Sequence, residues 1–239
     1  MQIKDIKFGT DGWRGIIADD YTFDNVRAVG RAIASYVLKN EDWQRGLLVG
    51  YDTRFLSRNF AEAISEELAA AGIHVTMSND YIPTPAISYM VKHLGKAGGV
   101  MITSSHNPAQ WNGVKFKAKY GGSGAPSIMK AIEQELHAGA APRQSGGKVD
   151  TADFKPEYIK GITRWIDLDK IARANFNFAI DCMYGAGRNI LSGIFAQHGI
   201  KHLQIHADVN PLFPGMNPEP IEPHVRELQE AVVREKCDA

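Results

Sequence analysis

The sequence predicts an α/β protein in which a mixed-sheet, three-layer α/β/α domain is followed by a second, incomplete α/β/α domain. Two observations lead to this prediction. Short apolar runs alternate with longer segments whose apolar residues recur at helical spacing. A stretch at residues 140–147, with two Ala, two Gly, one Pro and one Ser, separates two such series and has linker composition. We therefore expect a first domain over residues 1–139, a linker over 140–154 and a second domain over 155–239.

The first domain is expected to contain a helix over residues 23–38, because Val26, Val29, Ile33 and Val37 recur at helical spacing. Gly72 suits the C-terminal end of the next helix, since glycine readily adopts the left-handed conformation found there. The further elements, in chain order, are a strand at 47–51, a helix through 60–68, a strand at 74–77, a helix around 87–94, a strand at 99–103, a hairpin arm at 114–119 and a helix at 127–136.

The second domain repeats the alternation of strands and helices. Its expected elements are a helix at 155–168, a strand at 176–181, a turn at 185–187, a helix at 189–197, a strand at 202–206 and a helix at 222–236. The sequence stops just after that helix, without the strand to which a βα pattern leads. We therefore expect the second domain to be cut before it is complete.

Composition excludes several classes of protein. The 27 basic and 27 acidic residues balance, which argues against binding to nucleic acid or membranes through bulk charge. Cys182 and Cys237 are too few for a disulfide framework and lack metal-ligand spacing. No signal-peptide core or membrane-spanning apolar run occurs, so we expect a cytoplasmic protein.

The most informative segment is Thr103–Pro108, followed by Asn112–Lys117. Ser105 stands beside an imidazole and a carboxamide, just after an apolar run that reads as a buried strand, where open α/β sheets place their chemistry. Backbone N–H groups, His106 and Lys115 are suited to stabilise negative charge near that hydroxyl. These residues indicate a phosphate site, although Ser, Asn and Pro also form ordinary turns.

The segment resembles the active-serine loop of the α-D-phosphohexomutases, the phosphoglucomutase/phosphomannomutase superfamily. Lys7–Gly15 is similar to the N-terminal signature of that family, and Val49–Arg54 is similar to its Gly-x-Asp-x-Arg strand end. Phe213–Pro220 is similar to a loop of its second domain. The serine loop is highly specific and the others are moderately so, but their shared order extends the resemblance along essentially the whole chain.

The resemblance implies catalytic roles for four residues. Ser105 is expected to carry the phosphoryl group, donating it to a sugar phosphate and regaining one from the bisphosphorylated intermediate. Lys115 is expected to transfer protons, whereas Arg14 suits a bidentate phosphate clamp because arginine is a poor proton donor. For His106, a hydrogen bond to the phosphoryl group and a structural role in the loop both stay open.

Supporting roles follow for the neighbouring polar residues. Asn107 is expected to hold the loop through bonds to the backbone. Asp52 and Arg54 are expected to form an ion pair behind the serine loop, and Asp11 to hold Arg14 or backbone amides. Two further expectations concern glycines 9, 12 and 15, which would form turns beside the phosphate, and lysines 117 and 119, which would lie on an exposed strand edge.

The resemblance also implies parts that this sequence lacks. The family has four domains, and its Asp-Gly-Asp-x-Asp-Arg metal loop does not occur in these residues. Mg²⁺ is expected to bind the phosphate on Ser105 and aspartates outside this chain. Glucose 1,6-bisphosphate or another hexose 1,6-bisphosphate is the expected activator, a hexose phosphate the substrate, and the missing C-terminal domains of the same protein the partner. The parent would be an isomerase, and the chain alone would be inactive.

Rival interpretations remain open at this point. The chain could be a phosphosugar- or anion-binding module without catalysis, or part of a phosphoglucosamine mutase within the same family. A serine hydrolase is disfavoured, because no Gly-x-Ser-x-Gly elbow surrounds Ser105. The sequence does not choose among glucose, mannose and glucosamine phosphates, and it does not indicate the oligomeric state.

Overall fold

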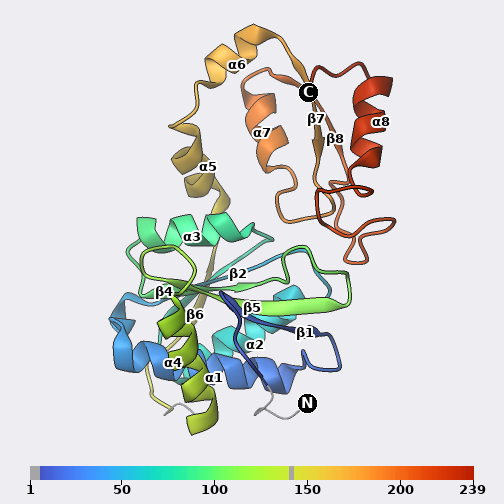
Figure 1. The fold of residues 1–239 in the computed structure, drawn as a ribbon. Coiled ribbons are helices and arrows are strands. Elements are labelled where there is room, and N and C mark those ends of the chain that lie inside the picture. Colours follow the sequence, from blue (N-terminus) through green and yellow to red (C-terminus); the bar gives the residue numbers. More distant parts are fainter. Residues whose placement is uncertain (1–5, 140–142) are drawn as a thin grey trace. The chain divides into compact units, whose positions relative to one another are not determined.

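The computed structural model describes residues 6–139 and 143–239, which fold into two compact units. Among these residues, the first unit comprises 6–104 and 110–154, and the second comprises 105–109 and 155–239. Each unit combines parallel strands with helices, so the prediction of the fold class is confirmed (Figure 1). Residues 1–5 of the expected first domain and 140–142 of the expected linker lie outside the described residues.

The first unit is built on a six-stranded mixed sheet. Its strands are β1 Gly12–Ile16, β2 Leu47–Tyr51, β3 Val75–Ser78, β4 Gly98–Ile102, β5 Trp111–Ala118 and β6 Val149–Ala152. Their order in the sheet is β1-β5-β4-β2-β3-β6, with β5 antiparallel to both of its neighbours and the other pairs parallel. The central strands β2 and β4 are buried at every position, as is typical of strands covered on both faces.

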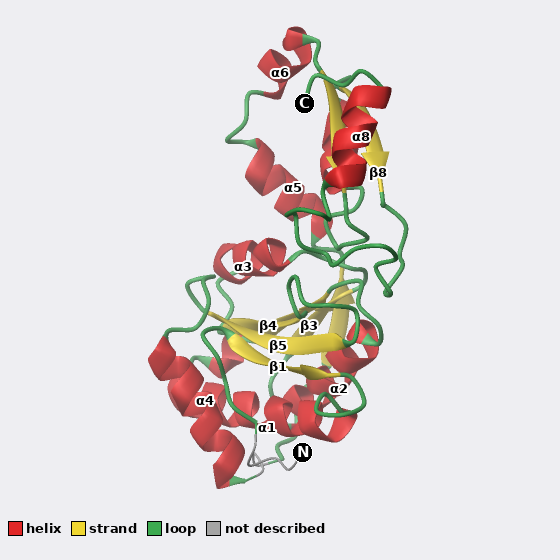
Figure 2. Ribbon diagram, turned by 45° about the vertical axis from the view of Figure 1, so that its right-hand side comes forward, coloured by secondary structure: helices red, strands yellow, loops and turns green. Residues whose placement is uncertain are grey.

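Helices cover both faces of this sheet. They are α1 Phe23–Asn40, α2 Ser57–Ala70, α3 Thr84–His93 and α4 Pro126–Ala138. Helix α3 lies on one face, and α1, α2 and α4 lie on the other (Figures 1 and 2). Helix α1 begins where the Thr22 side chain accepts a hydrogen bond from the backbone N–H of Asn25. A continuous apolar core, which includes Ile33, Val49 and Phe116, forms the rigid support for the loops at the strand ends.

Two strands were not indicated by the sequence. Gly12 and Gly15, expected to form turns, lie in β1, and a Cβ at Gly12 would collide with the carbonyl oxygen of Val114 on β5. Glycine is needed there for close approach of two strands rather than for a turn. Strand β6 falls within the expected linker and pairs with β3, Val149 lying opposite Val75. Only strand pairing reveals it, because its side chains are mostly exposed and give no apolar pattern.

The second unit contains a parallel pair of strands, β7 Asn177–Asp181 and β8 Lys201–Ile205, and four helices among its described residues. The helices are α5 Lys155–Thr163, α6 Leu168–Ala174, α7 Ile190–Gln197 and α8 Arg226–Arg234. A small core of Leu168, Ile190, Ile194, Phe195 and Ile200 packs against residues of α5 and β7.

Two helix predictions for the second unit were wrong in their bounds. The helix expected over residues 155–168 is interrupted, because the Asp167 side chain accepts a hydrogen bond from Lys170 N at 2.8 Å and starts a new helix. The last helix begins at Arg226 rather than at 222, since Pro223 disfavours helical backbone at the preceding residue. In the part of the chain that the structure describes, no helix is long and apolar enough to cross a membrane.

Candidate functional site

The serine-containing loop connects β4 to β5 at the carboxyl end of β4. Ser104 is fully buried, whereas Ser105 and His106 are exposed and Asn107 is half-buried. Ser105 has a φ angle of 58°, a left-handed conformation that is uncommon for a residue with a side chain. Such strain persists only where the surrounding structure enforces it, and it concentrates at functional sites. The Ser105 Oγ lies 3.4 Å from His106 Nδ1, and the imidazole tautomer decides which group donates.

Both ends of this loop are attached to the sheet of the first unit. At the start, the N–H of Thr103 donates to the carbonyl oxygen of Gly113 at 2.9 Å. At the end, Ile17 N donates to the carbonyl oxygen of Gln110 at 2.8 Å, and Arg54 Nη1 donates to that of Trp111 at 3.1 Å. The residues on either side of the loop are therefore held by β5 and by the segments that directly follow β1 and β2.

A buried ion pair lies behind these attachments. Arg54 Nε is 3.4 Å from Asp52 Oδ2, and the two side chains are 1% and 13% exposed. Asp52 Oδ1 also accepts hydrogen bonds from Arg54 N at 3.1 Å and from Ser57 Oγ at 2.8 Å. These contacts come from the segment that follows β2, so β2 and β4 bring Asp52 and Thr103 to the same edge of the sheet.

Burial dominates the electrostatics of this pair. Loss of solvation raises the pKa of Asp52, although Arg54 and the hydrogen bonds from Thr103 and Ser57 oppose that shift. Burial likewise lowers the pKa of Arg54, with a further contribution from repulsion by Arg14. Burial thus favours the neutral forms, and the mutual attraction of the two groups and their hydrogen bonds oppose it.

The predicted cations lie on two neighbouring strands. Arg14 on β1 is paired with Gly113 on β5, and Lys115 is paired with Gly12, so Arg14 and Lys115 project from the same face of the sheet. The structure adds a partner that the sequence did not indicate, because Lys115 Nζ lies 3.0 Å from Asp11 Oδ2. This contact fixes the direction of the Lys115 side chain.

The expectation that Lys117 and Lys119 lie on an exposed strand edge was wrong for the first of them. Strand β5 is flanked by β1 and β4, and Lys117 is only 5% exposed. Its ammonium group donates to Ser123 Oγ at 3.0 Å, and burial lowers its pKa. The exposed side chain of Lys119 forms an ion pair with Glu41 at 3.2 Å. Each of these ammonium groups therefore has a partner of its own, Ser123 for Lys117 and Glu41 for Lys119.

The sequence assigned no role to three polar neighbours of the candidate site: Ser57, Thr103 and Asn112. Asn112 is fully buried, and its Nδ2 donates to Ser57 Oγ at 2.9 Å. The only signal in the sequence is that Thr103 and Asn112 belong to the two segments around Ser105, Thr103–Pro108 and Asn112–Lys117. Their burial depends on strands that are distant in the chain.

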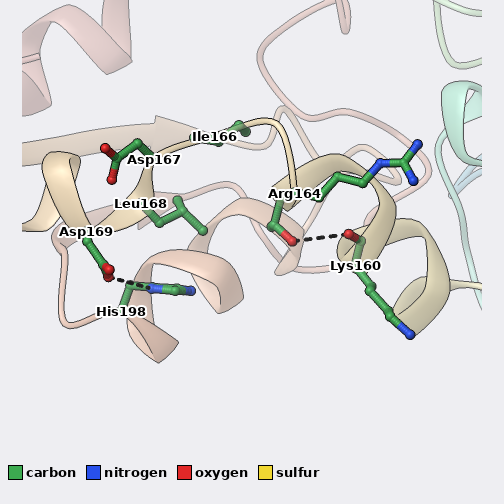
Figure 3. A pocket seen from close by; sticks show the side chains of 8 residues that line it. Lys160, Arg164, Ile166, Asp167, Leu168, Asp169 and His198 are labelled. Carbon is green, nitrogen blue, oxygen red and sulfur yellow. Dashed lines mark hydrogen bonds and ion pairs between the residues drawn. The ribbon is translucent and has the colours of Figure 1, made fainter.

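The second unit has a hollow of about 330 Å³ where α5, α6 and α7 meet (Figure 3). It is lined by Lys160, Thr163, Arg164, Ile166, Asp167, Leu168, Asp169 and His198. The charged ends of Lys160 and Arg164 extend away from Asp169 and His198, whose side chains are 4.0 Å apart (Figure 3). None of the sequence-predicted site residues lines it.

Groups of metal-binding side chains are a further feature of a possible site. Within residues 6–139 and 143–239, no group of three or more His, Cys, Asp or Glu side chains is placed to hold a metal ion.

Comparison with known proteins identifies the family. Residues 5–143 match the family model described as phosphoglucomutase/phosphomannomutase, α/β/α domain I. Residues 156–239 match the model described as α/β/α domain II of the same family. Together these two matches cover most of the chain.

Individual relatives agree with this assignment. The chain is 32% identical over 237 residues to a phosphoglucosamine/phosphogalactosamine mutase of Sulfurisphaera tokodaii, covering 97% of this chain and 51% of that protein. It is 31% identical over 230 residues to a phosphoglucomutase/phosphomannomutase of Thermococcus kodakarensis, covering 94% and 50%. A crystal structure of a protein from Thermus thermophilus, provisionally named a phosphomannomutase, superposes with a TM-score of 0.87 at 36% identity, covering 95% of this chain and 52% of that one.

The chain spans about half the length of the curated relatives it matches. Two consecutive family domains are matched in order, and the serine loop lies in the first of them. The chain therefore belongs to the phosphoglucomutase/phosphomannomutase family, with which it shares α/β/α domains I and II.

Proposed function

We propose that this chain is the N-terminal half of a phosphohexomutase that interconverts hexose 1-phosphate and hexose 6-phosphate through a phosphoserine and a bisphosphorylated sugar. The observation that supports this most strongly is Ser105 itself. It is an exposed hydroxyl in a strained conformation, on a loop attached at both ends to buried strands. A nucleophile on so rigid a support suits in-line transfer, in which positioning and charge stabilisation provide most of the catalysis.

The proposed cycle balances its groups in two transfers. Phosphorylated Ser105 gives its phosphoryl group to the free hydroxyl of the sugar phosphate; the P–O bond to Ser105 breaks as one to the sugar forms. Ser105 Oγ then takes the other phosphoryl group from the bisphosphate and leaves the isomeric monophosphate. In each transfer the attacking hydroxyl loses a proton and the leaving oxygen gains one.

Lys115 is proposed to move that proton, with Asp11 holding its ammonium group at 3.0 Å. Arg14, on the same face of the sheet, is proposed to bind phosphate oxygens through its two-pronged guanidinium. His106, 3.4 Å from Ser105 Oγ, is proposed to hydrogen-bond the phosphoryl group, and Asn107 to stabilise the loop.

Two cofactors are expected for the whole enzyme. Glucose 1,6-bisphosphate, or another hexose 1,6-bisphosphate, would phosphorylate Ser105 at the start of catalysis. Mg²⁺ is proposed on the family resemblance alone, bound to the phosphate on Ser105 and to aspartates outside this chain, since no group of three or more His, Cys, Asp or Glu among the described residues is placed to hold a metal ion.

The sugar is proposed to be a hexose or hexosamine phosphate. A phosphoglucosamine mutase is the second candidate within the family, and a specific observation favours it. Relatives from Natranaerobius thermophilus and Clostridium acetobutylicum, 34% and 30% identical, carry that name. Comparing glucose, mannose and glucosamine phosphates as substrates distinguishes the candidates.

The deciding experiment is a mass measurement on the protein after treatment with glucose 1,6-bisphosphate and Mg²⁺. We expect a gain of about 80 Da that maps to Ser105, because one phosphoryl group adds that mass, and its loss in Ser105→Ala. The chain alone is expected to lack mutase activity, and adding the C-terminal half should restore it. Binding of hexose phosphate without labelling would favour a non-catalytic module, and labelling of Ser105 by a fluorophosphonate would favour a hydrolase.

A further inference from the structure

Buried polar groups beneath the start of the serine loop form a closed ring of hydrogen bonds. Ser57 Oγ donates to Asp52 Oδ1 at 2.8 Å and accepts from Asn112 Nδ2 at 2.9 Å. Asn112 Oδ1 accepts from the N–H of Gly113 at 2.8 Å, and the Gly113 carbonyl oxygen accepts from Thr103 N at 2.9 Å. The Thr103 side chain closes the ring by its hydrogen bond to the Asp52 carboxylate.

Most members of this ring are removed from solvent. Ser57, Thr103 and Asn112 are 1%, 4% and 0% exposed, and the Asp52 side chain is 13% exposed. Inside a protein, connected hydrogen bonds strengthen one another, and removing one leaves its partner unsatisfied at a cost. Loss of one hydrogen bond in the ring therefore leaves a polar group of a neighbouring member without that partner.

The ring determines where the serine loop begins and, through Arg54, where it ends. Thr103 is two residues before Ser105, and the intervening Ser104 is fully buried. Arg54, paired with Asp52, donates to the carbonyl oxygen of Trp111 just after the loop. A single carboxylate is thus connected to both ends of the segment that contains the strained Ser105.

We propose that Ser57 and Thr103 are positioning residues that hold the Ser105 hydroxyl in its reactive orientation through the carboxylate of Asp52. The inference rests on the function proposed above, because it concerns the rate at which Ser105 accepts a phosphoryl group. The physical reason is that transfer needs the attacking oxygen aligned with the phosphorus, and a displacement of about 1 Å can lower the rate about 100-fold.

The chain offers matched controls for this proposal. Ser65 lies on the same helix as Ser57, is fully buried, and donates its hydroxyl to the carbonyl oxygen of Ala61 at 2.7 Å. Ser65→Ala therefore removes an equally buried hydroxyl that has no connection to the ring. Thr103→Val removes a hydroxyl while keeping the side-chain shape, and Thr103→Ser restores it.

The test measures phosphorylation of Ser105 by glucose 1,6-bisphosphate in the full-length protein, by quenched-flow and peptide mass. Ser57→Ala and Thr103→Val are expected to lower the saturating rate constant by about 10- to 100-fold. The donor concentration at half-saturation should change by less than about twofold, since neither residue is proposed to touch the donor. Thr103→Ser should recover most of the saturating rate constant. Ser65→Ala should keep the wild-type rate constant even where its Tm falls as much as that of Ser57→Ala.

Each outcome decides between the two proposals. Wild-type rates in Ser57→Ala and Thr103→Val, or an equal loss in Ser65→Ala, would overturn the positioning role while leaving the phosphoserine mechanism intact. A wild-type protein that gains no phosphoryl group at Ser105 would overturn the proposed function and this inference with it. If Ser57→Ala fails to fold, the comparison of Thr103→Val with Thr103→Ser still decides the matter.

Discussion

Replacing Arg54 by methionine would remove the cation paired with the buried carboxylate of Asp52. The two side chains are 1% and 13% exposed, and their charged atoms are 3.4 Å apart. Breaking such a pair by removing one partner costs about 3–5 kcal/mol, because the remaining charge stays buried. Whole domains are stable by only about 5–15 kcal/mol, so we expect Arg54→Met to lose a large part of the free energy of unfolding at pH 7.

The loss should depend on pH in a defined direction. Burial raises the pKa of Asp52, and Arg54 opposes that shift, so removing Arg54 should raise the pKa further. Between the unfolded and folded pKa values, folded Asp52 holds a proton that the unfolded chain has lost. Stability therefore falls as pH rises through that window, and the deficit of Arg54→Met should be smallest on its acid side.

The assay is urea unfolding followed by circular dichroism at several pH values from about 4.5 to 8, across the window above the ordinary pKa of Asp. Arg58→Met is the matched control, because Arg58 on α2 forms an exposed ion pair with Glu62 at 3.0 Å and should cost less than about 1 kcal/mol. Asp52→Asn combined with Arg54→Met should cost less than the sum of the single changes, since no charge remains buried. Losses that are equal in Arg54→Met and Arg58→Met, or independent of pH, would refute the reasoning.

Three further predictions concern the core around the site. Tyr21→Phe should raise stability by about 1–2 kcal/mol, because the fully buried Tyr21 hydroxyl has no hydrogen-bond partner among the described residues; a fall in Tm would instead indicate that a buried water satisfies it. Burial lowers the pKa of Lys117, so below pH 10.5 the unfolded chain binds a proton that the folded chain has released, and the free energy of unfolding of the wild type should rise with pH in that window. Lys117→Met should abolish this rise. Urea unfolding of both chains at pH 8, 9 and 10 measures this difference, and a difference that does not vary with pH would contradict it. Gly113→Ala should cost about 1–3 kcal/mol, since its Cβ would lie 2.7 Å from the carbonyl oxygen of Thr103 and 2.8 Å from that of Trp13; unchanged thermal unfolding would mean that the strands separate readily.

Patterns within short segments account for the predictions that succeeded. The spacing of Val26, Val29 and Ile33 predicts a helix that the structure contains, and the apolar run at 47–51 is the central strand β2. These patterns are local, because helices repeat every 3.6 residues and buried strands are continuously apolar. The failures lie where pairing with a distant strand overrides the local pattern, as in β1, whose glycines resemble turns, and in β6, which has no apolar repeat.

The sequence by itself determined the α/β class, the serine loop and its cationic neighbours, because each depends on a run of consecutive residues or on a periodic spacing. Only the tertiary structure decided what those residues contact. It placed Asp11 beside Lys115, buried Lys117 between two strands, and joined Ser57, Asn112 and Thr103 into a ring around Asp52. The physical reason is that hydrogen bonding and desolvation depend on which distant segments meet, and that is settled when the sheet assembles.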